Sequence, residues 1–179
     1  MMFRFLTVAM IALLSMAGVS HVARADMMIA VVDMQEILNK SDAAKNILDQ
    51  GKAQREKLAK EIKAIEDSLK KDEADVIKKK DTAKPEEFAV MRKDFEKKLV
   101  DARAKVQAKR KSTDDAFNKA VAELRDNVMT VIGAISTEKK IQLVITKQNV
   151  VIGDKNLDIT ADVMSKLNAR IKAIKIKFE

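Results

Sequence analysis

The feature that most constrains this chain is a pair of long heptad patterns on either side of one proline. Apolar or small residues recur at steps of three, four and seven, which is the spacing of an interhelical seam. Pro85 lies between the two patterns, and proline suits a first helical turn but breaks a helix interior. The first seam is Ala44, Leu48, Gly51, Leu58, Ile62, Ile65, Leu69 and Val76. The second is Phe88, Met91, Phe95, Leu99, Ala102, Val106, Phe117, Ala120, Leu124, Val128, Val131 and Ile135.

These patterns predict an antiparallel helical hairpin over residues 41–138, with helices at 41–80 and 85–138. At 1.5 Å per residue the helices would span about 60 and 80 Å, so the hairpin must project, with each seam consumed by its partner helix. One register, in which facing numbers sum to 164, pairs apolar residues in six layers: 76 with 88, 69 with 95, 65 with 99, 62 with 102, 58 with 106 and 44 with 120.

The same register predicts two polar layers inside the hairpin. Asp72 would face Arg92 and form an ion pair. Arg55 would face Lys109, and like charges at one level weaken local packing. The Arg55–Lys109 layer is therefore a candidate hinge, at which the hairpin would bend. The alternative is that both side chains snorkel to water and the hairpin stays straight.

The N-terminus has the pattern of a secretory signal peptide over residues 1–25. Arg4 precedes a nearly continuous apolar run from Leu6 to Val19, and Ala23-Arg24-Ala25 is a small-x-small cleavage site. The run is short for a membrane span, so the alternative of a retained anchor is less favoured. Cleavage before Asp26 would leave a mature chain with a net charge of +6, since two of the eight net positive charges are Arg4 and Arg24.

The composition of the mature chain argues against an enzyme. The sequence has no cysteine, and its one histidine, His21, lies in the predicted signal peptide. The usual nucleophile–base pairs and zinc ligands are therefore missing. The carboxylates are scattered along predicted helix surfaces, and no glycine-rich phosphate loop occurs. We predict no catalytic residue, no metal site and no cofactor.

The residues outside the hairpin predict a small β-rich head, made of residues 26–40 and 139–179. Residues 28–32 read as a buried strand, with Asp33 capping a short helix. Residues 141–146 and 150–152 read as the strands of a β-hairpin, and Thr160 as the N-cap of a last helix with Val163, Leu167, Ile171 and Ile174 on its buried face. Such a head is small and its three strands leave open edges, so oligomerisation through the head is expected. The expected head core and oligomer contacts are Ile29, Val31, Leu143, Val144, Ile145, Val163 and Leu167.

Taken together, these segments resemble the Skp/OmpH family of periplasmic chaperones. The resemblance rests on the signal peptide, the run from Ile29 to Met34, the charged hairpin, Leu143-Val144-Ile145 and, most specifically, the run from Asp158 to Leu167. It implies an α+β, mostly helical fold and a homotrimer, with a β-barrel body and hairpin tentacles around a cavity. It also implies an ATP-independent holdase in the periplasm, whose clients are unfolded outer-membrane proteins.

Two other functions fit parts of the sequence. A structural or adaptor coiled coil of the cell envelope would need the same hairpin. A pI near 9.5 suggests nucleic-acid binding, but no recognised module is present and phenylalanine is the only aromatic type.

Four lysines at the hairpin tip, Lys78, Lys79, Lys80 and Lys84, are candidates for contact with anionic lipid or lipopolysaccharide. The favoured alternative is a solvated turn, because Asp81, Glu86 and Glu87 partly cancel their charge.

Overall fold

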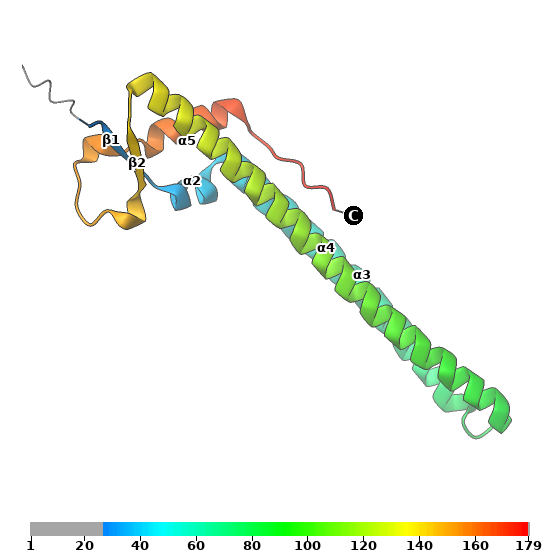
Figure 1. Ribbon diagram of the computed structural model, residues 1–179. Helices are drawn as coiled ribbons and strands as arrows, with labels where there is room; N and C mark the ends of the chain where they lie inside the picture. The colour runs from blue at the N-terminus through cyan, green and yellow to red at the C-terminus, as the bar shows by residue number, and fades with distance from the viewer. Residues whose placement is uncertain (1–26, 179) are drawn as a thin grey trace, which may run out of the picture.

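A long helical hairpin projects from a small head in the computed structural model, which describes residues 27–178 (Figure 1). Helix α3 is Asp42–Lys79 and helix α4 is Pro85–Lys139, which confirms the predicted hairpin to within about one residue at each end. The Ser41 hydroxyl accepts a hydrogen bond from the backbone N–H of Ala44 and so caps α3. Pro85 occupies the first turn of α4. The predicted signal peptide, residues 1–25, lies outside the described residues.

The head contains a two-stranded parallel sheet. Strand β1, Ile29–Val32, pairs with strand β2, Leu143–Thr146, in a register that places Ile29 opposite Leu143. The predicted β-hairpin is wrong, because residues 150–152 form no strand and a 3-10 turn, η1 (Lys147–Asn149), follows β2 directly. Parallel strands need a long crossover connection. Here the whole helical hairpin is that crossover, so β1–β2 pairing joins its two ends.

The segment around Asp158 covers the other edge of β1. Asp158 forms a parallel bridge with Val31, and the backbone N–H of Ile159 donates to the Val31 carbonyl oxygen at 2.9 Å. A second 3-10 turn, η2 (Lys155–Leu157), precedes this bridge. Strand β1 therefore lies between β2 and a chain segment 127 residues beyond Val31, and this segment covers its second edge at Val31.

Helix α5, Thr160–Arg170, follows at once, and its first residue links the head together. The prediction that Thr160 is the N-cap is wrong, because Ile159 occupies that position and Thr160 is the first helical residue. Its hydroxyl accepts a hydrogen bond from the backbone N–H of Asp33 at 2.8 Å and donates to the Asp158 carboxylate. Asp158 also accepts the backbone N–H of Thr160. Burial alone would raise the pKa of Asp158, but hydrogen bonds from Thr160 and Lys147 outweigh it and lower the pKa.

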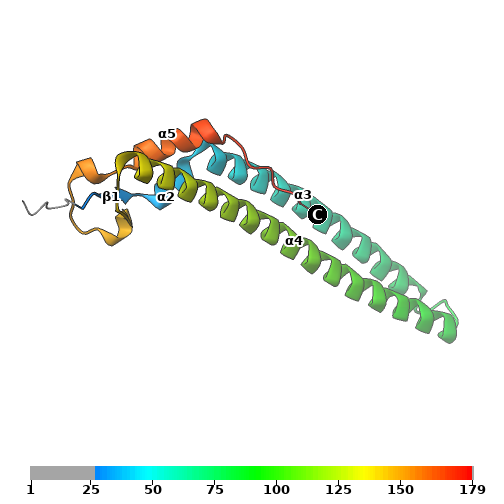
Figure 2. The same ribbon diagram turned by 45° about the horizontal axis from the view of Figure 1, so that its top comes forward.

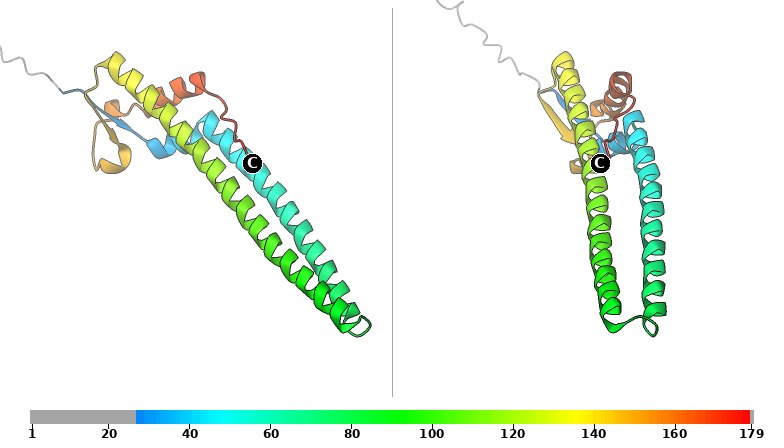
Figure 3. Two further views of the ribbon diagram at one scale, coloured as in Figure 1. Left: turned by 45° about the vertical axis from the view of Figure 1, so that its right-hand side comes forward. Right: turned by 90° about the vertical axis from the view of Figure 1, so that its right-hand side faces the viewer.

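The short helix α2, Met34–Lys40, lies between β1 and the hairpin. Its predicted cap is confirmed, since an Asp33 carboxylate oxygen accepts the Glu36 backbone N–H at 2.9 Å. The views in Figures 2 and 3 show α5 and α2 gathered at the head end of α3 and α4, with the two long helices side by side beyond them.

One apolar core extends from the head into the first part of the hairpin. It joins residues of β1, α2, α5 and the C-terminal segment to the head-proximal turns of both long helices. Its members are Ala30, Val32, Ile37, Ala43, Ala44, Ile47, Ala120, Leu124, Val128, Val131, Ile132, Ile135, Ile159, Val163, Leu167 and Ile174. None of the helices within residues 27–178 carries an apolar stretch long enough to cross a bilayer.

The residues expected in the head core divide into two sets. Val31, Val163 and Leu167 are buried. Ile29, Val144 and Ile145 are half-buried, and Leu143 is exposed. The loop after β2 adds Val151 and Ile152, whose side chains are fully exposed. The head thus presents an apolar surface that the chain itself does not cover.

The Thr160 hydroxyl gives a first test of this account of the head. We expect Thr160→Val to destabilise the fold by about 1–3 kcal/mol, because the Asp33 backbone N–H would lose its acceptor in a partly buried place. Thr160→Ser keeps the hydroxyl and should cost much less. Urea unfolding at one fixed protein concentration measures both variants. Equal stability of Thr160→Val and the wild type would contradict this role.

Candidate functional site

The seam of the hairpin is only half-covered beyond the head core. From Ile62 outward to the tip and back to Val106, the apolar seam residues of both helices are all partly accessible to water. At the end of this stretch nearer the head lies an open groove of about 480 Å³, here called the distal groove. Its apolar floor is Ile62, Ile65, Leu69, Leu99, Ala102 and Val106, and its rim is Glu66, Arg103, Gln107 and Arg110.

The expectation that the two helices consume the whole seam is therefore wrong. An apolar stripe about 100° wide needs neighbours on more than one side, and a single partner helix covers only the line of contact. Near the head, α5, α2 and the C-terminal segment supply the missing cover. In the distal half no described element does. The groove residues themselves were all predicted as seam residues, but not as exposed ones.

Three further apolar side chains point away from the seam altogether. Ile77, Val90 and Val100 are 64%, 59% and 63% exposed. Sequence reasoning missed them because only seam positions were considered. The available signal was a large aliphatic residue outside the heptad pattern, on helices whose exposed residues are mostly charged.

The ion pairs across the hairpin differ from those predicted. Asp72 accepts a hydrogen bond from Lys98 at 3.0 Å, and Arg92 pairs with Glu96 on its own helix at 3.3 Å. Side chains tilt toward the N-terminus of their own helix, which is toward the head on α3 and toward the tip on α4. Long side chains therefore meet residues more than one turn away from the level predicted by equal spacing.

The same tilt removes the basis of the predicted hinge. Lys109 donates to Glu61 rather than lying against Arg55, whose side chain is exposed. The hydrogen bond from Lys109 lowers the pKa of Glu61, with smaller contributions from the charges of Lys57 and Lys105. At this layer Lys109 has an acidic partner, so the two like charges do not simply repel each other. A weakened, bending hairpin at this level therefore loses its basis.

The level of Gly51 contains a close contact between the two long helices. The Phe117 ring lies over this glycine, where an added Cβ would be 3.1 Å from the ring carbon Cε2. Gly51 thus permits a close approach that any larger residue would have to push apart. This packed layer marks the end of the head core on the hairpin.

The tip lysines lie where the sequence placed them. Lys78 and Lys79 form the last turn of α3, Lys80 is its C-cap and Lys84 is the N-cap of α4. All four are exposed. Lys78 lies 3.9 Å from Asp75, and two glutamates begin α4 beside Lys84. The cation cluster is thus solvent-facing and partly offset by its neighbours.

No cluster of side chains that could hold a metal ion is found among the described residues. Over residues 27–178, no three carboxylate, histidine or cysteine side chains converge in the way that a metal ion requires. What the surface offers instead is apolar contact within a charged rim.

The family of the chain follows from its sequence as a whole. The model of the family "Outer membrane protein (OmpH-like)" matches residues 28–167. The chain belongs to this family. No curated protein matches it in sequence. Among solved structures it resembles a proposed OmpH-like outer membrane chaperone from Caulobacter crescentus CB15, with a TM-score of 0.79 and 18% identity over 86% of this chain and 90% of that one. At this identity the likeness establishes the shared fold.

The Glu61–Lys109 pair offers a direct check on the geometry beside the distal groove. We expect Lys109→Met to raise the pKa of Glu61 toward its ordinary value, whereas Lys57→Met should raise it less, because Lys57 contributes charge without a hydrogen bond. The folded-state pKa is lowered, so the pair stabilises the hairpin above the ordinary pKa, and this contribution is lost as the pH falls through the folded value. NMR titration of the Glu61 carboxyl measures it. Equal shifts in the two variants would exclude the pairing.

Proposed function

We propose that this protein is an ATP-independent holdase chaperone of the periplasm, which binds unfolded outer-membrane proteins and prevents their aggregation. The observation that carries the proposal is the half-open seam of the distal hairpin, an apolar surface with a charged rim on an arm that projects from the head (Figure 2). Membership of the OmpH-like family supports it, as does the printed description of the Caulobacter structure as an outer membrane chaperone.

The geometry suits a client without fixed structure. Apolar surface removed from water contributes about 25 cal/mol per Å², and the groove with its outward aliphatic residues offers this in small, separate portions. Many weak contacts hold an unfolded chain without one strong site that would prevent its release. The arginines on the rim attract acidic segments and raise the rate of capture in a salt-dependent way.

We further propose that the protein is a homotrimer, assembled through its head into a β-barrel body, with the three hairpins enclosing a cavity for the client. The apolar head surface of Leu143, Val151 and Ile152 supports assembly there, because large exposed apolar surfaces mark interaction sites. Export through a cleaved signal peptide would place the trimer in the periplasm.

An adaptor coiled coil of the envelope is the principal alternative. It would bind a folded partner in a stable complex and would not keep an unfolded protein in solution. A lipid contact at the tip is not part of the proposal, because the tip lysines are offset by neighbouring carboxylates. If a variant with all four tip lysines changed to Gln bound anionic vesicles more weakly than the wild type does, a lipid contact at the tip would be supported.

The holdase activity can be tested with a urea-denatured outer-membrane β-barrel protein diluted into buffer without nucleotide. We expect the wild type to suppress light scattering. A variant with Ile77, Val90 and Val100 changed to Gln should need a several-fold higher concentration for the same effect, because the exposed aliphatic contacts are gone while the seam is intact.

A matched control has the exposed residues Ala64, Ala74 and Ala104 of the same two helices changed to Gln. This control should act like the wild type, which would show that added amides do not by themselves reduce capture. Unsuppressed scattering with the wild type would overturn the holdase proposal and favour an adaptor.

Assembly through the head has its own test. We expect the double variant Val151→Asp/Ile152→Asp to be monomeric with unchanged helicity, because both side chains are exposed in the single chain and a charge there disturbs only an apolar interface. Asn149→Asp, also exposed in the same loop, is the control. Native mass measurement reads the result, and a trimer in the double variant would place the interface elsewhere.

A further inference from the structure

The chain continues past the end of α5 as a C-terminal segment, residues 171–178, which runs along the hairpin (Figures 1 and 2). Here it is called the tail. It begins in extended conformation at Ile171, and its apolar residues Ile174, Ile176 and Phe178 alternate with lysines. Ile174 is 4% exposed and belongs to the core, whereas the lysines between these residues are exposed. The family match ends at residue 167, so the tail lies outside it.

One side chain of α3 holds the tail by its backbone. The Gln50 Nε2 donates to the Ile174 carbonyl oxygen at 2.7 Å, and the Gln50 Oε1 accepts the Ile176 N–H at 3.0 Å. Asn46 orients this amide by accepting a second hydrogen bond from its Nε2 at 2.7 Å. Gln50 thus binds two alternate residues through their backbone groups, as a neighbouring strand would.

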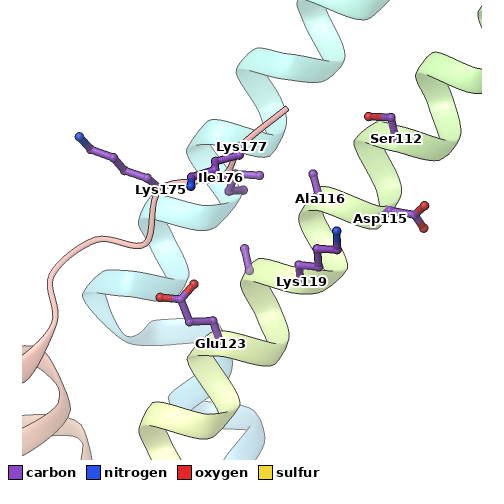
Figure 4. A pocket seen from close by; sticks show the side chains of 9 residues that line it. Ser112, Asp115, Ala116, Lys119, Glu123, Lys175, Ile176 and Lys177 are labelled. Atoms are coloured by element: carbon purple, nitrogen blue, oxygen red, sulfur yellow. The ribbon is translucent and has the colours of Figure 1, made fainter. Parts of the chain in front are cut away.

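The other side of the tail is loosely packed. A cavity of about 450 Å³ separates it from α4, lined by the small Ala116 and Ala120 and by Ile176 (Figure 4). Asp115 and Glu123 are also among the residues that line this cavity, and the tail carries three lysines. Gln50, the cavity and these α4 residues are together called the tail seat. The seat has room for a larger side chain than the isoleucine it holds.

We propose that the tail seat is a second binding site, which accepts an extended client segment with alternating apolar residues in place of the tail. Strands of outer-membrane barrels have this alternation, so this inference rests on the proposed function and names the client segment it would bind. The exchange replaces the same two backbone hydrogen bonds, and a bulky client side chain would fill space that the tail leaves empty. The tail, tethered to the seat, competes as an intramolecular ligand.

The test uses the full chain and a dye-labelled peptide with the sequence of residues 171–178. Ile176→Pro removes the N–H that Gln50 accepts and leaves the core residue Ile174 in place. We expect this variant to bind the peptide at least tenfold more tightly than the wild type. Adding Gln50→Ala should abolish the gain. Lys172→Ser, an exposed change in the tail outside the cavity lining, should behave as the wild type does.

A second release variant, Ile174→Ser/Ile176→Ser, should show the same gain, with circular dichroism to confirm the fold. A peptide with serine at the same two positions should not bind. Equal peptide affinity in the wild type and both release variants, or a gain that persists without Gln50, would overturn the proposal. The proposal would also be overturned if the released tail only exchanged between copies of the protein, in a concentration-dependent way, and no peptide was bound.

The peptide assay contains no aggregating client, so it separates this proposal from the holdase function. Peptide binding that depends on Gln50, together with failed suppression of aggregation, would leave the seat intact and remove the chaperone role. Suppressed aggregation without peptide binding would leave the chaperone role intact and remove the tail seat as a binding site.

Discussion

Two helices cannot cover each other's apolar stripes, and the rest of this structure depends on that limit. A stripe about 100° wide contacts a single partner along a line, so its flanks stay accessible unless a third element covers them. At the head end, α5, α2 and the tail provide this cover and the seam residues join one core. Farther out nothing in residues 27–178 does so, and the same pattern of residues becomes the distal groove.

The parallel pairing of β1 with β2 makes the arrangement stable. Because the hairpin is the crossover between these strands, its two ends are held at a fixed separation by the sheet and by the Asp158 segment on the far edge of β1. The distal hairpin then needs no strong seam of its own. Its half-open packing is tolerated because the covered end determines how the helices meet.

The helices could be predicted from sequence because their signals are local. Heptad spacing, the Ser41 cap and Pro85 each act within a turn or two. The ion partners of Asp72 and Lys109 could not, because side-chain tilt shifts contacts along an antiparallel pair. Val151 and Ile152 have strand-like composition but form no strand, and both side chains are fully exposed. Thr160 was predicted as a helix N-cap, whereas its hydroxyl accepts a hydrogen bond from Asp33, 127 residues away in the sequence.

The seam needs a third element to cover its flanks, and the tail supplies one whereas the distal groove is left without one. The tail covers the seam not with a helix but with an extended chain, held through backbone hydrogen bonds to Gln50 and through alternating isoleucines. These interactions specify a conformation and an alternation rather than a sequence. Our proposal that another extended chain can cover this surface follows from that lack of sequence specificity. Cover along the hairpin therefore falls from complete at the head, through partial at the tail seat, to absent in the distal groove. Under our proposals, an unfolded chain bound in the distal groove would lie next to a seat suited to its strands.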